Sequence, residues 1–286
     1  MKGQRIIRAG MIDHRVLYCL YSRLRIIRIL TFQVAGFVLV GLLWGGNSFS
    51  LDWKQYKSQH FVVYYNAAPE DFVENVAEMA ESYYREITDN LGFTRHKSWN
   101  LSDRAKIYIY NDSDDYAQNA RQANWSAGAA SPDSKTIRTF PAAQGFFDTT
   151  LPHELGHIIF REFIGHRSSI PLWFEEGVAM YQEKAKRWGS KKVVQGLLDN
   201  GNFIPLERLS IMRLTSRSKQ EFVNLFYAES ASSVYYLISE LGQSRFVRFC
   251  RKLREGIKFE EALESVYVRF ENIEEFNESW VKYLKN

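Results

Sequence analysis

Two histidines and a glutamate stand at a spacing that can bind and use a metal ion. Residues 151–157 read Leu-Pro-His-Glu-Leu-Gly-His, so His153 and His157 are four positions apart. On a helix this spacing puts both imidazoles on one face, about 5–6 Å apart, where both can bind one ion. Glu154 points in a neighbouring direction, from which its carboxylate can take a proton from a water on the metal. The motif H-E-x-x-H therefore predicts metal-assisted hydrolysis.

A third ligand must complete such a site, because catalytic zinc binds three protein side chains and keeps one position open. One zincin pattern has a histidine six residues after the second one, but that position is Phe163. Two cysteines are too few for a cysteine-rich zinc site. The remaining pattern takes a glutamate from a second helix, and Glu176 lies 19 residues after His157. Glu175 is the alternative, and only one of them can face the metal, because adjacent helical positions point about 100° apart.

Taken together, these motifs resemble those of the gluzincin metallopeptidases, and in particular the small bacterial peptidase MA-like domains. The resemblance rests on residues 151–157 followed by Pro-Leu-Trp-Phe-Glu-Glu-Gly-Val-Ala-Met-Tyr at 171–181. Residues 53–65 are similar to the family's opening strand, and Phe-Tyr-Ala-Glu-Ser at 226–230 is similar to a later Tyr-Ala-x-Ser helix. The resemblance covers most of the chain from residue 51, and the two metal motifs are its specific part.

The resemblance implies a role for each of five residues. His153, His157 and Glu176 would hold one zinc ion per chain, and the following Gly177 matches the family, which favours Glu176 over its neighbour. Glu154 would be the general base. Tyr227 is the candidate for the side chain that donates a hydrogen bond to the oxyanion, and a packed aromatic residue is the alternative at that position.

The resemblance also implies how substrate binds and where this chain departs from its relatives. In gluzincins an edge strand of the sheet pairs with the substrate backbone; the candidates here are residues 125–130 and 135–140. Thermolysin-like members carry an aspartate four residues after the glutamate ligand, where this chain has Met180. Another acceptor, such as a backbone carbonyl, must therefore orient the zinc-binding imidazole.

The elements that would position these residues predict an α+β fold. Strands are expected where β-branched and aromatic residues cluster: 60–65, 105–110, 125–130 and 135–140. Apolar residues recur at helical spacing from Pro69 to about Leu91, where Gly92 ends the helix. Nearly everything from Asp148 onward is helical in pattern. We therefore expect a sheet lobe over about 51–145 and a helical lobe over about 146–286, with the active site between them.

Two helical segments carry more detailed expectations. Thr149 or Thr150 should cap the motif helix, and Pro152 suits its first turn. From Lys219 the pattern predicts three or four amphipathic helices that bury a set of apolar residues: Leu225, Val234, Leu237, Ile238, Leu241, Phe246, Val247, Phe249 and Cys250. The basic residues between positions 245 and 254 form a solvated face, with contact to a membrane surface as the alternative.

The first fifty residues differ in charge from the rest. The chain has a net charge of +4, but residues 1–50 hold seven basic residues and one acid, which leaves −2 for residues 51–286. This balance gives no indication of nucleic-acid binding. Residues 29–44 form an uncharged, largely apolar run of 16 residues, which predicts a signal peptide cleaved after Ser50 or an uncleaved single-span anchor. Translation could begin at Met1 or Met11. A cleaved signal or a retained anchor would both place residues 51–286 outside the cytoplasm, in the cell envelope, as a secreted or a membrane-anchored protein.

Composition and motifs together predict a zinc-dependent metallopeptidase of the bacterial cell envelope that acts on peptides or proteins. The 45% hydrophobic and 24% charged residues exclude a disordered chain. No aminopeptidase-type glutamate motif is evident, which favours an endopeptidase. One alternative is an inactive, zinc-stabilised binding or scaffold module, although Glu154 would have no use there. The other is an anchored interaction protein without metal. The sequence does not indicate the oligomeric state.

Overall fold

The computed structural model describes residues 53–93, 99, 101–119, 128–141, 145–215 and 217–286. Residues 50–286 form a compact unit of their own. The signal peptide or anchor predicted at 29–44 lies outside the described residues. Within the described ranges, no helix combines the length and apolar character needed to cross a membrane.

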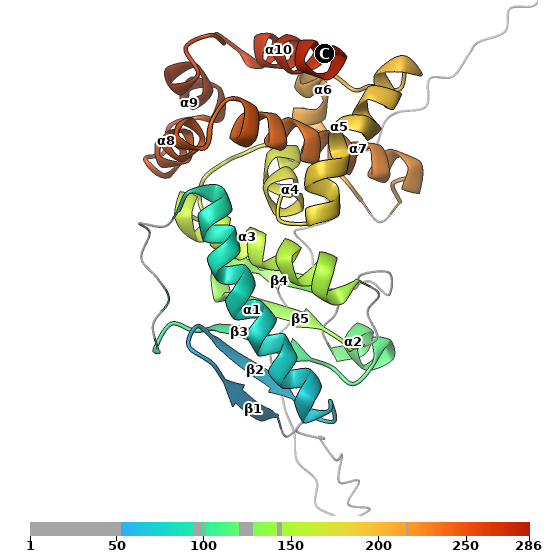
Figure 1. Ribbon diagram of the computed structural model, residues 1–286, viewed down its shortest axis with the longest axis vertical. Coiled ribbons are helices and arrows are strands. Elements are labelled where there is room, and N and C mark those ends of the chain that lie inside the picture. Colours follow the sequence, from blue (N-terminus) through green and yellow to red (C-terminus); the bar gives the residue numbers. More distant parts are fainter. Residues whose placement is uncertain (1–52, 94–98, 100, 120–127, 142–144, 216) are drawn as a thin grey trace, which may run out of the picture. The chain divides into compact units, whose positions relative to one another are not determined.

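Five short strands form one mixed sheet in the order β1-β2-β3-β5-β4 (Figure 1). Their bounds are β1 Lys54–Lys57, β2 Phe61–Tyr65, β3 Ala105–Ile109, β4 Gly128–Ser131 and β5 Thr136–Thr139. Strands β2, β3 and β5 run parallel, while β1 and β4 are antiparallel to their neighbours. Strands β2, β3 and β5 confirm three of the predicted strands, and β4, at one edge of the sheet, confirms the described part of the strand predicted at 125–130, whose residues 125–127 lie outside the described residues. The pattern gave no separate β1, because its sequence, Lys-Gln-Tyr-Lys, is polar and mostly exposed.

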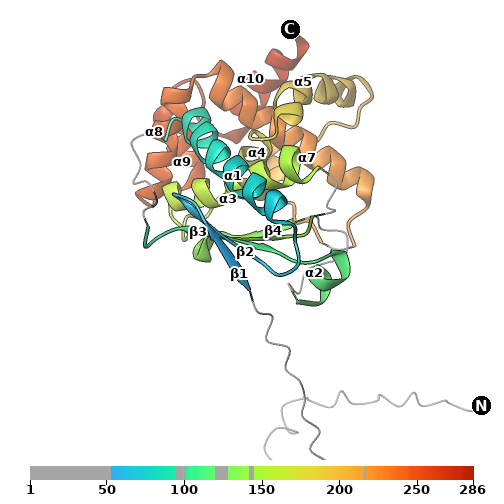
Figure 2. The same ribbon diagram turned by 60° about the horizontal axis from the view of Figure 1, so that its bottom comes forward.

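One long helix covers the sheet. Helix α1, Glu70–Leu91, ends at Gly92, whose φ of 73° is the left-handed conformation that favours glycine. The helix predicted from Pro69 to Leu91 is therefore confirmed. Its buried side packs on β2 and on α3, Leu151–Ile164, and Figure 2 shows α1 and α3 on the same side of the sheet. The short helix α2, Ser113–Asn119, precedes the β4–β5 hairpin.

Helices make up nearly all of the chain after residue 146, as predicted. After α3 they are α4 Leu172–Met180, α5 Lys184–Asp199, α6 Leu206–Ile211, α7 Gln220–Tyr235, α8 Gln243–Arg254, α9 Phe259–Val266 and α10 Ile273–Lys285. Helix α3 packs on α1 and β4 as well as on α4 and α8. It therefore joins the sheet part and the helical part of the molecule (Figure 1).

Two glycines let the central helices pack closely. A Cβ on Gly156 of α3 would lie 3.0 Å from Cα of Ala179 on α4. A Cβ on Gly177 of α4 would lie 2.3 Å from the carbonyl oxygen of Ser230 on α7, closer than real Cβ atoms come. Both glycines lie beside the predicted metal-binding residues, so the close packing draws α4 toward α3 and α7 toward α4.

The start of α3 differs from the prediction. A π-helical turn, η2 Phe146–Thr150, leads into the helix, and Thr150 already has helical dihedrals. The backbone N–H groups of Thr149 and Thr150 both donate to the carbonyl oxygen of Gly145. The predicted threonine cap is therefore wrong, because the preceding turn continues into the helix and no threonine side chain accepts a capping bond. Pro152 lies in the first turn, as expected.

The C-terminal part confirms the predicted amphipathic helices. From Gln220 onward there are four α-helices, α7 to α10, and a π-helical turn, η3 Tyr236–Glu240. Phe246, Phe249 and Cys250 are fully buried. Leu225 and Val247, also expected in the core, are only half-buried. Burial raises the pKa of the Cys250 thiol well above its usual value, so this cysteine is a core residue rather than a reactive one.

Candidate metal centre

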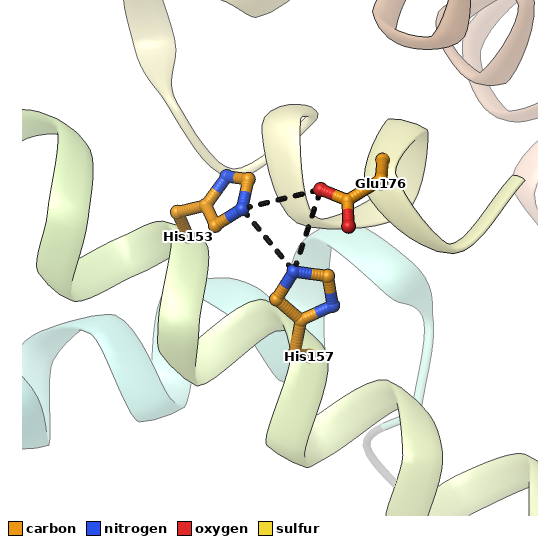
Figure 3. Close-up of side chains that lie close together, drawn as sticks. All are labelled: His153, His157 and Glu176. Atoms are coloured by element: carbon orange, nitrogen blue, oxygen red, sulfur yellow. Dashed lines mark hydrogen bonds and ion pairs between the residues drawn. The ribbon is translucent and has the colours of Figure 1, made fainter. Parts of the chain in front are cut away.

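Helices α3 and α4 bring three potential metal ligands to one point (Figure 3). The Nε2 atoms of His153 and His157 are 3.2 Å apart. The Oε2 atom of Glu176 lies 3.6 Å from Nε2 of His153 and 3.7 Å from Nε2 of His157. Ligands about 2.0–2.1 Å from a tetrahedral zinc ion are roughly 3.3–3.4 Å from one another. The three atoms thus form a triangle of the size that one zinc ion requires.

Local structure explains why these side chains meet. His153 and His157 are one helical turn apart on α3, and their rings lie nearly perpendicular, at 78°. Neighbouring residues on α3 and α4 are fully buried, among them Phe160 and Phe174, whose rings contact each other. The Phe160–Phe174 contact joins α3 to α4, and the small Gly156 lets the two helices approach closely. This packing holds Glu176 against the two imidazoles.

The charges in the cluster suit a cation. Burial alone would lower the pKa of His153, but contacts with Glu176 and Glu183 and the charge of Glu154 raise it to about 10. Burial alone would raise the pKa of Glu176, but His157 and His153 lower it. The carboxylates thus stabilise positive charge at the centre of the triangle. Two imidazoles and one carboxylate are a common donor set for catalytic zinc, so the residues present fit the metal.

Glu183 orients the first histidine. Its Oε1 lies 2.9 Å from Nδ1 of His153, on the side of the ring opposite the triangle. The glutamate is 4% exposed and follows α4 in the turn before α5. Such a partner sets the tautomer of a metal-binding imidazole and makes it more basic. The backbone carbonyl suggested for this role is therefore replaced by a carboxylate, while Met180 lines the pocket beside it.

Glu175 points away from the triangle. Its two carboxylate oxygens form a forked ion pair with Arg161, one turn after His157 on α3. Arg161 also donates to the carbonyl oxygen of Ser168, at 2.9 Å. The nearest Glu175 oxygen is 4.0 Å from Nδ1 of His157, which is beyond hydrogen-bond distance. Of the two adjacent glutamates, Glu176 alone faces the two imidazoles.

The triangle opens into a pocket of about 380 Å³. Glu154 lines this pocket together with Tyr227 of α7, Gly128 of β4 and Lys186 of α5. Cγ of Glu154 is 3.8 Å from the point that a Cβ on Gly128 would occupy. All five residues singled out from the sequence, the three ligands with Glu154 and Tyr227, therefore surround one cavity beside the edge strand β4.

Tyr227 keeps its proton in this setting. Burial raises the pKa of its hydroxyl, and the nearby charges of Glu176, Glu154 and Glu183 raise it further. The hydroxyl is thus a hydrogen-bond donor at neutral pH. This property suits the predicted contact with a negatively charged oxygen, a role that stays a prediction.

Glu183 and Arg161 were not anticipated at the site, whereas Gly128 lies within the candidate edge strand predicted at 125–130. Glu183 lies seven positions after Glu176 but past the end of α4 at Met180, so its position depends on the turn that follows the helix. Arg161 lies four positions after His157, so its place on the same helical face was visible in the sequence. The position of Gly128 depends on β4 packing against α3, a long-range contact that no local pattern reports.

Comparison with known proteins identifies the family. The model of the Peptidase MA superfamily matches residues 93–286, while no curated protein matches the sequence. The match begins after β2, so the likeness of residues 53–65 to the family's opening strand stays a prediction.

Two solved structures are similar to this chain at low identity. Native yeast LTA4 hydrolase is 14% identical with a TM-score of 0.50, over 80% of this chain and 39% of the hydrolase. The M60 catalytic domain of Clostridium perfringens ZmpB, solved with two CBM51 domains, is 15% identical with a TM-score of 0.42, over 82% and 23% of the respective chains. This chain thus spans well under half the length of either structure. The family match and the α+β architecture show that the chain belongs to the Peptidase MA superfamily of metallopeptidases and has a gluzincin-like fold.

Proposed function

We propose that the chain is a zinc-dependent peptidase that hydrolyses internal peptide bonds in the cell envelope. The observation that carries the proposal is the triangle of His153, His157 and Glu176 with Glu154 in the same pocket. The family match supports peptide-bond hydrolysis. The envelope location rests on the basic and apolar character of the first fifty residues.

In this proposal the substrate backbone binds along β4. This strand is the last in the sheet order and pairs with β5 on its inner side. A further strand added there would extend the sheet next to α3. Gly128 lets β4 pack closely on the start of α3 beside Glu154, since a Cβ there would lie 2.4 Å from Cγ2 of Thr150 and 3.8 Å from Cγ of Glu154. The scissile bond would thereby lie over the metal centre.

Glu154 and Tyr227 have separate roles in the reaction. When bound by the three ligands, zinc supplies a Lewis acid that polarises the scissile carbonyl and lowers the pKa of a water to about 7. Glu154 accepts the proton of the attacking water and passes it to the leaving amine. Tyr227 donates its hydroxyl proton in a hydrogen bond to the carbonyl oxygen as negative charge develops there. Glu183 holds the ring of His153 in place throughout.

The substitution Glu154→Gln tests the proposal directly. It preserves size and the carbonyl oxygen but removes the base, so we expect turnover to fall roughly 10²–10⁴-fold. Cleavage is measured on a proteome-derived peptide library, with zinc content and the unfolding midpoint expected to stay unchanged. Glu240→Gln, at an exposed glutamate that ends η3, is the matched control and should cleave like wild type.

Two outcomes would overturn the peptidase proposal. In one, the wild type holds zinc and cleaves nothing across the library. In the other, Glu154→Gln cleaves as well as wild type. Either result favours the alternative of a zinc-stabilised binding module in the envelope.

The location has its own test. A reporter that is active only outside the cytoplasm, fused after Asn286, should be active in the full chain. Activity of a cytoplasmic reporter at the same position would contradict the envelope proposal. The intact mass of the mature protein then distinguishes the two forms, because cleavage after Ser50 predicts a chain that starts at Leu51.

A further inference from the structure

Helix α5 exposes a face that combines lysines with large apolar side chains. The helix contains five basic residues and a single acid, Asp199, at its last position. We define the α5 face by the residues that lie opposite its buried side and cover a broad arc, about half of the helix circumference: Lys184, Ala185, Lys186, Trp188, Gly189, Lys192, Val193 and Gly196. The opposite side, with Arg187, Ser190 and Val194, is buried.

The apolar members of the α5 face are unusually exposed. Trp188 is 70% exposed and Val193 is 54% exposed. Gly189 and Gly196 add no bulk between them, and a Cβ on either would meet nothing within 4 Å. No side chain therefore protrudes at either glycine position, and a flat partner surface can come close to the helix there. Figure 2 shows α5 at the periphery of the helical part.

The lysines of the α5 face are largely available. Lys184 pairs with Glu86 at 3.5 Å, and its side chain is 67% exposed. For Lys186 and Lys192, no acidic group among the described residues lies within ion-pair distance. Lys191, beside the face, lies over the ring of Tyr283 at 4.1 Å. Of these lysines, Lys184 alone therefore has an acidic partner within ion-pair distance among the described residues.

Helix α8 provides an internal comparison. It exposes Arg245, Arg248, Arg251, Lys252 and Arg254. The apolar residues of α8 are buried or half-buried, so its outer side presents charge alone. Charge alone favours a solvated surface, whereas lysines around an exposed tryptophan are typical of helices that lie in a membrane interface. This difference distinguishes α5 from the basic face that the sequence indicated at 245–254.

We propose that the α5 face docks on an anionic lipid surface. The lysines would lie against the headgroups, while Trp188 and Val193, on the two flanks of the face, would enter the interface, where an aromatic ring with a polar edge is favoured. Lys186 also lines the pocket that holds Glu154, so docking brings the mouth of the pocket to the lipid. Resting on the proposed peptidase function, this orientation assigns the substrate class as polypeptide segments at a membrane surface.

A dye on the α5 face tests docking in the full chain. Val193→Cys is labelled with the polarity-sensitive dye nitrobenzoxadiazole in a Cys19→Ser background; Cys250 is fully buried and stays unlabelled. The matched control carries the dye on α8 through Arg248→Cys. Each protein is mixed with vesicles of phosphatidylcholine alone or of phosphatidylcholine with phosphatidylglycerol. Because the dye reports only its own surroundings, binding of the vesicles by residues 1–50 does not imitate the result.

We expect the emission at position 193 to brighten and shift to the blue on phosphatidylglycerol vesicles, and to stay unchanged on phosphatidylcholine. The dye at position 248 should not respond. Adding Lys192→Ala to the Val193 probe should weaken the response about five-fold in apparent affinity, the equivalent of one lysine near an anionic surface, and salt should weaken it further.

Several results would overturn the proposal. They are an unchanged signal at position 193, an equal response at 248, an equal response on uncharged vesicles, or a response to a soluble polyanion such as heparin but not to vesicles. Docking is measured without any substrate, so its failure is distinct from failure of the peptidase proposal, which Glu154→Gln tests.

Discussion

Glu176 of α4 and Glu229 of α7 lie on either side of one close helix contact, where Gly177 meets Ser230. Both glutamates are largely buried, but their surroundings have opposite effects. Two imidazoles lower the pKa of Glu176 against the effect of burial. Glu229 is fully buried, accepts one bond from the backbone N–H of Ile204 at 2.9 Å, and has a pKa raised to about 8 by burial.

The comparison shows that partners, rather than depth, decide the charge of these carboxylates. Glu176 has cationic neighbours and stays ionised, as a metal ligand must. The Oε2 atom of Glu229 has no hydrogen-bond partner among the described residues, so the side chain retains a proton at neutral pH. Glu176 on α4 is therefore charged and can bind a metal ion, whereas Glu229 on α7 is neutral and packs in the core.

The largest effect should come from removing a metal ligand. His153→Ala, His157→Ala or Glu176→Ala takes away one of three donor atoms, and we expect stoichiometric zinc to be lost after dialysis. Glu175→Ala and Glu229→Gln should keep one zinc per chain, measured by mass spectrometry of the metal. If Glu176→Ala kept its zinc and Glu175→Ala lost it, Glu175 would be the third ligand, and the comparison of Glu176 with Glu229 would fail.

Tyr227 sharpens the comparison, because it lies on α7 near Glu229 yet lines the metal pocket. Tyr227→Phe removes only the hydroxyl, and we expect kcat to fall roughly 10²–10³-fold, as for loss of one oxyanion donor. Zinc content should not change. Tyr235→Phe, on the same helix and outside the pocket lining, is the control. Equal activity of Tyr227→Phe and wild type would make Tyr227 a packing residue.

Glu183 should affect zinc less than the ligands do. Glu183→Gln weakens the contact that orients His153, and we expect zinc affinity to fall roughly 10–100-fold. Glu175→Gln should change affinity less, because its carboxylate pairs with Arg161 and lies 4.0 Å from His157. Competition with a chelator measures both. A greater loss for Glu175→Gln would mean that the ion pair, rather than the Glu183 contact, orients the site.

Local spacing predicted the parts of the site that helix geometry controls. His153 and His157 meet because residues four apart share a helical face, and the predicted strands and α1 follow their hydrophobic periods. Glu176 comes from another helix, and its identification needed the resemblance to known metallopeptidases. Helical geometry alone could only say that one of two neighbouring glutamates faces the metal.

The remaining features depend on interruptions of regular structure. Glu183 reaches His153 from the turn that follows the end of α4 at Met180 and precedes α5. Thr150 fails as a cap because η2 supplies helical backbone before α3 begins. The protonation of Glu229 depends on burial between helices far apart in sequence. Patterns over a few residues cannot report any of these.

The smallest effect concerns Glu229, where the comparison predicts a dependence of stability on pH. The folded pKa of about 8 lies above the usual value of 4.5, so the folded chain binds this proton more tightly than the unfolded chain. Its contribution to stability is complete below about pH 4.5 and is lost as the pH rises through about 8. Between about pH 6 and pH 7 we expect the free energy of unfolding to fall by about 1 kcal/mol from this group.

Glu229→Gln should abolish that component, because the amide keeps an oxygen for the Ile204 N–H and has no proton to lose. Urea unfolding at saturating zinc, repeated across this pH range, measures the difference between the variant and wild type. Glu221→Gln, at an exposed position in the first turn of α7, should keep the wild-type slope. Parallel profiles for wild type and Glu229→Gln would show that Glu229 is ionised when folded. The contrast between Glu176 and Glu229 would then fail, because burial would not have raised the pKa of Glu229 enough to keep it protonated.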